Sequence, residues 1–181
     1  MAERTDPPPR RPPTDLPPEI VLRHDLRPGD LGSIVHLHGR LYAEEYGFDP
    51  TFEAYVAGPM SEFVRTHSER DRLWIAERDG RIVGCIAIVE AAPEEAQLRW
   101  YLVDPGARGL GLGRTLLSEA VSFCRRRGYR SIFLWTVRAL TAAARLYVAF
   151  GFVKTEEKPG RQWGVDVVEE KYVLTLSGRG A

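Results

Sequence analysis

Residues 108–113 read Arg-Gly-Leu-Gly-Leu-Gly, a segment in which glycines alternate with larger residues. Glycine lets a ligand approach the backbone closely. An apolar segment at 98–103 precedes the glycines, and apolar residues with helical spacing follow them within 116–124. Because the first N–H groups of a helix have no internal partner, they attract anions. The pattern therefore predicts a backbone site for a phosphate or pyrophosphate where this helix begins.

Two other phosphate-binding loops do not fit this segment. A nucleoside-triphosphate loop ends in Gly-Lys-Ser or Gly-Lys-Thr, whereas residues 113–115 read Gly-Arg-Thr. A dinucleotide loop needs Gly-x-Gly-x-x-Gly, and neither Gly109 nor Gly111 begins that pattern. The spacing that fits is Arg-x-x-Gly-x-Gly, formed by Arg108, Gly111 and Gly113. On the loop alone, an ordinary glycine-rich turn between a strand and a helix stays open.

A second segment narrows this choice. Residues 146–152 read Leu-Tyr-Val-Ala-Phe-Gly-Phe and end a predicted helix at 141–150. In this order, the two segments resemble the acyl-CoA loop and the Leu-Tyr-x-x-x-Gly-Phe segment of the GNAT N-acyltransferase superfamily. Many members carry an asparagine seven residues before the tyrosine. Here Leu140 occupies that position, so the asparagine's contact with the cofactor is not carried over.

The flanking residues extend the resemblance to residues 20–176. Residues 38–49 and 163–176 are similar to the acetyltransferase halves of fusions with MarR-type repressors. Nothing before residue 20 could form the winged helix of such a repressor. The resemblance implies an N-acetyltransferase that acts on a primary amine of a small molecule or a protein. An alternative is a module that binds acyl-CoA and senses or regulates without turnover.

The resemblance also implies acetyl-CoA as the cofactor. The pyrophosphate would lie on the glycine loop, and the pantetheine arm would pair with the strand before it, which splays from the next strand. The implied cofactor residues are Leu102, Val103, Arg108, Gly109, Leu110, Gly111, Leu112, Gly113 and Arg114. We predict no metal, because His36 and His38 do not share a helix face and no other ligand cluster is apparent.

Tyr147 is the candidate general acid. A thiol has a pKa of about 8.5 and a phenol of about 10, so a tyrosine can donate a proton to a departing thiolate after modest tuning. A tyrosine that only packs against the pantetheine is the alternative. No carboxylate stands out as the base, and Glu45 near the end of the first helix is the candidate, acting directly or through water.

Arg99 is the candidate for recognition of the acceptor. Alternation predicts Gln97, Arg99 and Tyr101 on one face of the central strand, and residues 98, 100 and 102 on the other. A charged group on a covered sheet is costly unless it is paired. We therefore expect Arg99 to meet an acidic residue or the substrate; a solvated arginine on a bare face is the alternative. Aromatic residues expected around the acceptor include Tyr42, Tyr46 and Trp135.

The composition limits the class of protein. At 181 residues with a formal net charge of +0, the chain fits one domain and offers no electrostatic case for nucleic acid or membrane. No apolar segment approaches the roughly 20 residues of a membrane span. Cys85 and Cys124 are predicted to be buried free thiols, which suits a reducing cytoplasm. Residues 1–18 are predicted to form a disordered proline-rich tail, and 19–177 a single domain.

Strands and helices alternate along the chain. The order predicts an α/β (α+β) fold with a mixed, mostly antiparallel sheet and helices on both faces. Asp79-Gly80 predicts a type I′ hairpin, and Asp30 is expected to cap the first helix. The sequence leaves open the acceptor, the acyl chain and whether the protein forms a homodimer. Strands are expected at 20–26, 73–78, 81–91, 98–103, 131–136, 153–158 and 165–176, and helices at 30–45, 51–67, 114–127 and 141–150.

Overall fold

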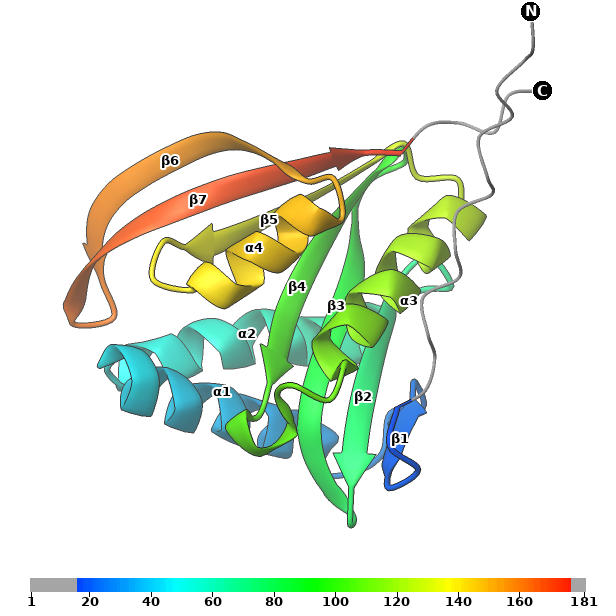
Figure 1. The fold of residues 1–181 in the computed structure, drawn as a ribbon, viewed down its shortest axis with the longest axis horizontal. Coiled ribbons are helices and arrows are strands. Elements are labelled where there is room, and N and C mark those ends of the chain that lie inside the picture. Colours follow the sequence, from blue (N-terminus) through cyan, green and yellow to red (C-terminus); the bar gives the residue numbers. More distant parts are fainter. Residues whose placement is uncertain (1–15, 177–181) are drawn as a thin grey trace, which may run out of the picture.

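The computed structural model describes residues 16–176, in which seven strands form one sheet in the order β1-β2-β3-β4-β5-β7-β6 (Figure 1). Only β4 and β5 pair in parallel; the other neighbours are antiparallel. This confirms the predicted mixed, mostly antiparallel sheet. The strands are β1 (Ile20–Arg23), β2 (Arg72–Arg78), β3 (Arg81–Ala92), β4 (Glu95–Val103), β5 (Ser131–Val137), β6 (Val153–Gln162) and β7 (Val165–Thr175).

Helices cover both faces of the sheet, as predicted, and each face has its own core (Figure 1). On one face, Leu41 and Phe52 pack with Ile75 and the other apolar residues under α1 and α2. On the opposite face, Leu116 and Phe152 join the core under α3 and α4. The helices are α1 (Asp30–Tyr46), α2 (Pro50–Thr66), α3 (Leu112–Arg126) and α4 (Thr141–Ala149), with a short 3₁₀ turn, η1 (Pro105–Ala107).

Several local predictions can be compared with the structure. Asp79 and Gly80 both have positive φ, 52° and 71°, in the hairpin between β2 and β3, which fits a type I′ turn. Both cysteines are free and buried. The strand expected at 153–158 was placed too short, because β6 continues through Pro159 and Gly160 to Gln162. An edge strand tolerates these residues, and β6 is an edge of this sheet.

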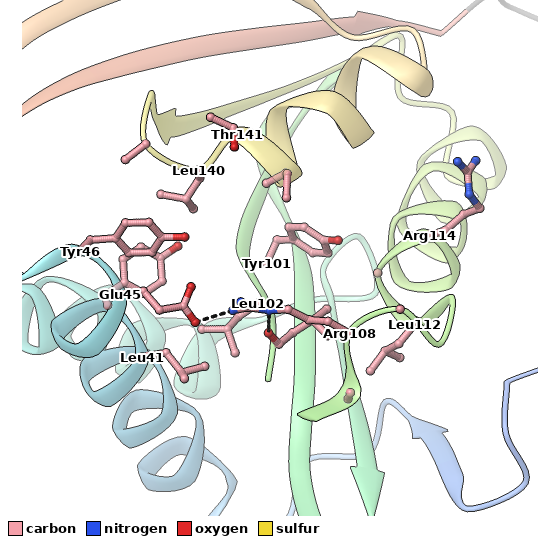
Figure 2. Close-up of a pocket in the computed structure, with 18 of the residues that line it drawn as sticks. Leu41, Glu45, Tyr46, Tyr101, Leu102, Arg108, Leu112, Arg114, Leu140 and Thr141 are labelled. Carbon is pink, nitrogen blue, oxygen red and sulfur yellow. Dashed lines mark hydrogen bonds and ion pairs between the residues drawn. The ribbon is translucent and has the colours of Figure 1, made fainter. Parts of the chain in front are cut away.

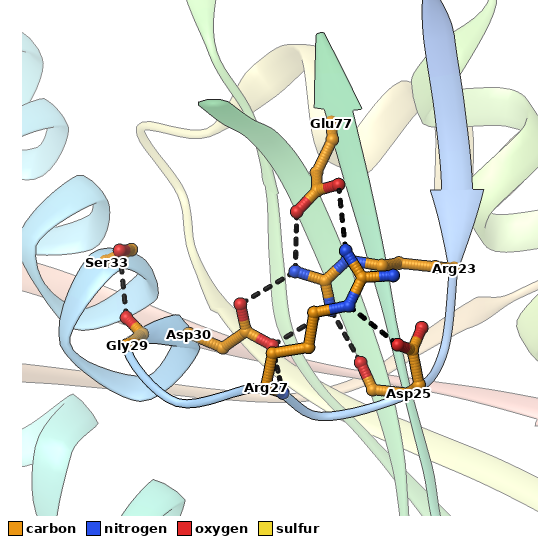
Figure 3. Close-up of polar contacts among 7 residues, drawn as sticks. All are labelled: Arg23, Asp25, Arg27, Gly29, Asp30, Ser33 and Glu77. Atoms are coloured by element: carbon orange, nitrogen blue, oxygen red, sulfur yellow. Dashed lines mark hydrogen bonds and ion pairs between the residues drawn. The ribbon is translucent and has the colours of Figure 1, made fainter. Parts of the chain in front are cut away.

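Asp30 does not cap α1, contrary to the prediction. Gly29 is the N-cap, and the Asp30 carboxylate instead accepts two hydrogen bonds from Arg23 and one from the Arg27 N–H (Figure 3). Arg23 also donates to Glu77 on β2 at 2.6 Å. The carboxylate is drawn to the buried guanidinium rather than to the helix N–H groups. This cluster joins β1, the start of α1 and β2, and β1 ends at Arg23 rather than at residue 26.

The ends of the chain bear on the predicted tail. Residues 1–15 and 177–181 lie outside the described residues, so the prediction of a disordered segment remains a prediction there. Within the described part, Leu16 packs against the core under α3 and α4. None of the described helices is long and apolar enough to cross a membrane.

Two features of β4 prepare the functional site. First, β4 pairs with β5 only as far as Gln97, opposite Phe133, so its last residues have no partner on that side. Second, Trp100 has φ 48° in a bulge where two residues of β4 oppose Ile86 of β3. The bulge reverses the alternation, so the prediction that residues 98, 100 and 102 share a face is wrong. Tyr101 packs toward α3 and α4, whereas Leu102 packs toward α1 and α2.

Candidate active site

The unpaired end of β4, the glycine loop and the start of α3 surround a pocket of about 360 Å³ (Figure 2). All the predicted cofactor residues line it except Leu110, whose side chain is exposed. The opposite wall comes from α1 and from the start of α4, including Leu140 and Thr141. The predicted cofactor residues thus lie around one cavity, which we call the cofactor pocket.

Two glycines of the loop are required for different reasons. Gly111 is the N-cap of α3 with φ 80°, and no side chain caps this helix, so its first N–H groups are available to an anion. Gly113 lies against Tyr101, and a Cβ added there would overlap the tyrosine hydroxyl. The loop therefore combines a left-handed turn with a close approach of the helix to β4. Both features suit a backbone cradle for a pyrophosphate.

An ion pair connects the loop to α1 beside the cofactor pocket. Arg108 Nη2 lies 2.6 Å from Glu45 Oε1, and Arg108 Nε donates to the Val103 carbonyl (Figure 2). Glu45 and Tyr46 both line the cofactor pocket. Neither lines the second cavity, where Arg99 and Trp135 lie. The carboxylate predicted to be a base is therefore engaged with the arginine predicted to bind the pyrophosphate.

The second cavity, of about 110 Å³, adjoins the cofactor pocket and shares Tyr42, Tyr101 and Leu140 with it. Aromatic rings dominate its wall: Phe52 lies 4.3 Å from Tyr42, and Trp163 lies 5.1 Å from Phe52, between ring centroids. We call this cavity the aromatic chamber. Its wall includes Phe48, Phe52, Tyr55, Trp135 and Trp163, together with Arg99 and Tyr147.

Tyr147 is a buried residue of the aromatic chamber, carried by α4. Its ring lies 5.9 Å from that of Tyr101 and 6.0 Å from that of Tyr172. Burial, with a smaller contribution from the neighbouring tyrosines, raises the pKa of Tyr147 well above its usual value. An ordinary tyrosine is already protonated at neutral pH, so the raised pKa makes the hydroxyl a weaker acid, and the case for Tyr147 as a proton donor rests on its position.

Arg99 lies partly buried in the aromatic chamber without an acidic partner among the described residues. Its guanidinium carbon lies 4.9 Å from the Trp100 ring centroid. Burial lowers the pKa of Arg99. Within residues 16–176 the partner of Arg99 is therefore not an acidic residue, and that half of the prediction is wrong. A substrate group as its partner and a solvated arginine on a bare face both stay open.

Two polar residues of the aromatic chamber were missed from the sequence. His38 lies four residues before Tyr42, so the two share a helix face, and this spacing is the signal that could have indicated it. Glu169 comes from β7, and no local pattern connects it to Arg99. Within residues 16–176, no group of three or more His, Cys, Asp or Glu side chains is placed to hold a metal ion.

Comparison with known proteins identifies the family. The model of the Acetyltransferase (GNAT) family matches residues 34–152, so the chain belongs to this family. It is 34% identical over 121 residues to an uncharacterized N-acetyltransferase of Schizosaccharomyces pombe, covering 64% of this chain and 72% of that protein. It is 30% identical over 177 residues to mycothiol acetyltransferase of Acidothermus cellulolyticus, covering 88% of this chain and 50% of that protein. These relatives support N-acetyltransferase activity.

Solved structures share the fold. One is yncA of Salmonella typhimurium, solved with its cofactor acetyl-CoA, with a TM-score of 0.72 and 18% identity over 90% of this chain and 97% of that one. Another is ribosomal-protein-alanine N-acetyltransferase of Brucella melitensis, with a TM-score of 0.70 and 20% identity over 86% and 99% of the two chains. At these identities, the likeness extends to the fold alone.

Proposed function

We propose that the protein transfers an acetyl group from acetyl-CoA to a primary amine of a small molecule or a protein. The observation that carries this proposal is the junction of the two cavities. The cofactor pocket and the aromatic chamber share Tyr42, Tyr101 and Leu140, so the two cavities are neighbours and a cofactor in one would lie beside an acceptor in the other. The family relationship and the named relatives support the same reaction class.

The residues around the cofactor pocket fit the proposed cofactor. The uncapped start of α3 and the left-handed Gly111 suit the pyrophosphate, and Arg108 adds positive charge. The unpaired backbone of Leu102 and Val103 suits the amides of a pantetheine arm. When bound, acetyl-CoA supplies an acetyl thioester, whose carbon–sulfur bond breaks as the carbon–nitrogen bond forms.

The reaction moves two protons. The acceptor ammonium, with a pKa of about 10, must lose one before it can attack. Glu45 stays the proposed base, although its ion pair with Arg108 must open or the proton must pass through water. The departing thiolate gains the other proton, and Tyr147 is the proposed donor because it lines the aromatic chamber, which adjoins the cofactor pocket.

A non-catalytic acyl-CoA sensor is the second candidate function. It rests on the resemblance to MarR-type fusions, which stays a hypothesis, and on Leu140 in place of asparagine. The position of Tyr147 in a lined chamber beside the cofactor pocket favours the enzyme. The chain spans about half the length of mycothiol acetyltransferase, so that protein's acceptor is not transferred to it. A cytoplasmic location and a homodimer remain predictions.

The test is the release of free CoA from acetyl-CoA with a panel of primary amines. We expect turnover by the wild type and a loss of about 100- to 10,000-fold in single-turnover rate for Tyr147→Phe, because the ring remains and the proton donor is lost. Tyr129→Phe is the matched control, since it removes a buried hydroxyl that donates to the Arg70 carbonyl outside both cavities.

A binding measurement separates the cofactor from the chemistry. Acetyl-CoA should raise the melting temperature of the wild type and of Tyr147→Phe. It should not do so for Gly113→Glu, which puts a side chain and a negative charge into the cradle. Gly58→Glu is the control, because Gly58 faces open space on α2. Acetyl-CoA binding without CoA release from any amine would favour the sensor.

A further inference from the structure

The polar groups of the aromatic chamber suggest what kind of amine enters it. Its wall contains one guanidinium, from Arg99, and, among the groups that accept hydrogen bonds, the imidazole of His38 and the carboxylate of Glu169. Arg99 and Glu169 form no ion pair with each other or with any other described residue. Each group comes from a different element: β4, α1 and β7. The chamber therefore has a positive site and acceptor sites that do not neutralise one another.

His38, which lines this space, has a buried ring nitrogen without a hydrogen-bond partner among the described residues. Its Nδ1 lies 2.9 Å from the Ile34 carbonyl oxygen. Because a carbonyl can only accept a hydrogen bond, Nδ1 carries the proton and Nε2 is an acceptor. The residue is 2% exposed, and Nε2 has no partner. Burial lowers the pKa of His38 to about 4, so the imidazole is neutral at pH 7.

Such groups are costly to leave without partners. A buried acceptor with no hydrogen bond lowers the stability of the folded protein, and a charge in an apolar setting lowers it further. Arg99 is bordered by aromatic rings and has no carboxylate to offset its burial. A ligand with an anionic group would pair with Arg99, and N–H donors on the same ligand would supply hydrogen bonds to His38 and Glu169.

We propose that the acceptor is a small molecule in which the amine and a carboxylate occur together, as in an amino acid. Arg99 binds the carboxylate, and His38 Nε2 accepts a hydrogen bond from the amine. Glu169, which accepts from Gln162 with one oxygen, repels the carboxylate from its side and so favours this orientation. This inference rests on the proposed acetyl transfer and names the class of its substrate.

The size and walls of the chamber agree with this class. Its volume of about 110 Å³ is smaller than the roughly 300–1,000 Å³ of pockets for drug-sized ligands. Tyr55 and Trp163, with ring centroids 5.2 Å apart, offer an apolar wall for the remainder of the molecule. A guanidinium binds a carboxylate through paired N–H groups, which gives it both affinity and orientation.

The test compares pairs of acceptors that differ only in the carboxylate. L-phenylalanine with 2-phenylethylamine, and smaller amino acids with their decarboxylated amines, are assayed for CoA release and product mass. We expect a higher kcat/KM for the amino acid in the wild type. Arg99→Met should lower it by roughly 10- to 100-fold, the value of a hydrogen bond to a charged group, and leave the amine unaffected. Arg99→Lys should retain part of the preference.

Two further variants complete the design. Arg145→Met, which removes an exposed arginine of α4, should change nothing. His38→Phe keeps a ring beside Tyr42 and removes the acceptor, so it should weaken both members of a pair by about 2- to 10-fold. Acetyl-CoA binding, measured by thermal shift, should be the same in all variants, because none of these residues lines the cofactor pocket.

Binding of the acceptor gives a readout apart from turnover. In the presence of CoA, calorimetry should detect amino acids with the wild type and not with Arg99→Met. If decarboxylated amines are acetylated as well as amino acids, the proposed carboxylate site is wrong while acetyl transfer stands. If amino acids neither bind nor are acetylated, the proposed carboxylate site is wrong, whereas the proposed acetyl transfer fails only if the wider panel of primary amines also releases no CoA.

Discussion

Arg23 and Arg99 both carry a guanidinium into the interior, but Arg23 is surrounded by carboxylates and Arg99 by aromatic rings. Arg23 is held by Asp30 at 2.7 Å and Glu77 at 2.6 Å (Figure 3). The hydrogen bond with Asp30 is the main cause that raises the pKa of Arg23 above its usual value. Arg99 faces aromatic rings, and burial lowers its pKa.

The difference separates a group that serves the fold from one that is available to a ligand. The Arg23 cluster joins three elements and leaves both carboxylates paired. Removing one member of a buried pair exposes the full cost of the remaining charge. Within residues 16–176, Arg99 has no carboxylate partner to lose. Its burial therefore lowers the stability of the fold, and no ion pair of the described residues offsets this cost. The comparison therefore predicts opposite outcomes for the same substitution at the two sites.

Arg23→Met should cause the largest loss of stability. The substitution leaves Asp30, with an 8% exposed side chain, without its guanidinium. Breaking a buried pair in this way costs about 3–5 kcal/mol. Urea unfolding followed by circular dichroism measures the change. A loss below about 1 kcal/mol, the ordinary range of a point mutation, would show that the cluster does not hold β1 to α1.

The pH dependence of stability should also distinguish the Arg23 cluster from Arg99, with a smaller change in the free energy of unfolding. Burial acts to raise the pKa of Asp30, but hydrogen bonds from Arg23 and the Arg27 N–H outweigh it, and the pKa is lowered. A carboxylate with a lowered folded pKa contributes stability above its unfolded pKa and loses it as the pH falls through the folded pKa.

The free energy of unfolding should therefore differ between wild type and Asp30→Asn most at neutral pH. The difference should narrow as the pH falls below about 4, the ordinary range of an aspartate. The difference between wild type and Arg99→Met should not change over the same range. A constant gap for Asp30→Asn would mean that its carboxylate is not held by the guanidinium in solution.

The two cavities show what a single sequence can predict. One wall of the cofactor pocket follows from contiguous residues, because the strand, the glycine loop and the helix start are adjacent in the chain. Its members could therefore be predicted by position, and only Leu110 lies off the wall. The splayed strand could be expected from the family resemblance, and the short pairing of β4 with β5 agrees with it.

The aromatic chamber could not be predicted in the same way. The alternation of faces fails at the bulge at Trp100, which changes the faces of the following residues. No glycine or proline in this part of the strand indicates the bulge. Glu169 meets the chamber through the pairing of β7 with β5, which depends on the whole sheet. Glu45 was expected near the acceptor, but its ion pair with Arg108 puts it beside the cofactor pocket.

Arg99→Met should have the smallest effect on stability and sharpens the comparison most. The side chain lies against aromatic rings and has no carboxylate partner, so an apolar residue of similar length removes a desolvation cost and leaves no charge behind. We expect the free energy of unfolding to be unchanged within about 1 kcal/mol or to rise. The matched measurement on Arg23→Met gives the scale. If Arg99→Met loses as much stability as Arg23→Met, then Arg99 serves the fold, and its lack of an acidic partner no longer points to a ligand.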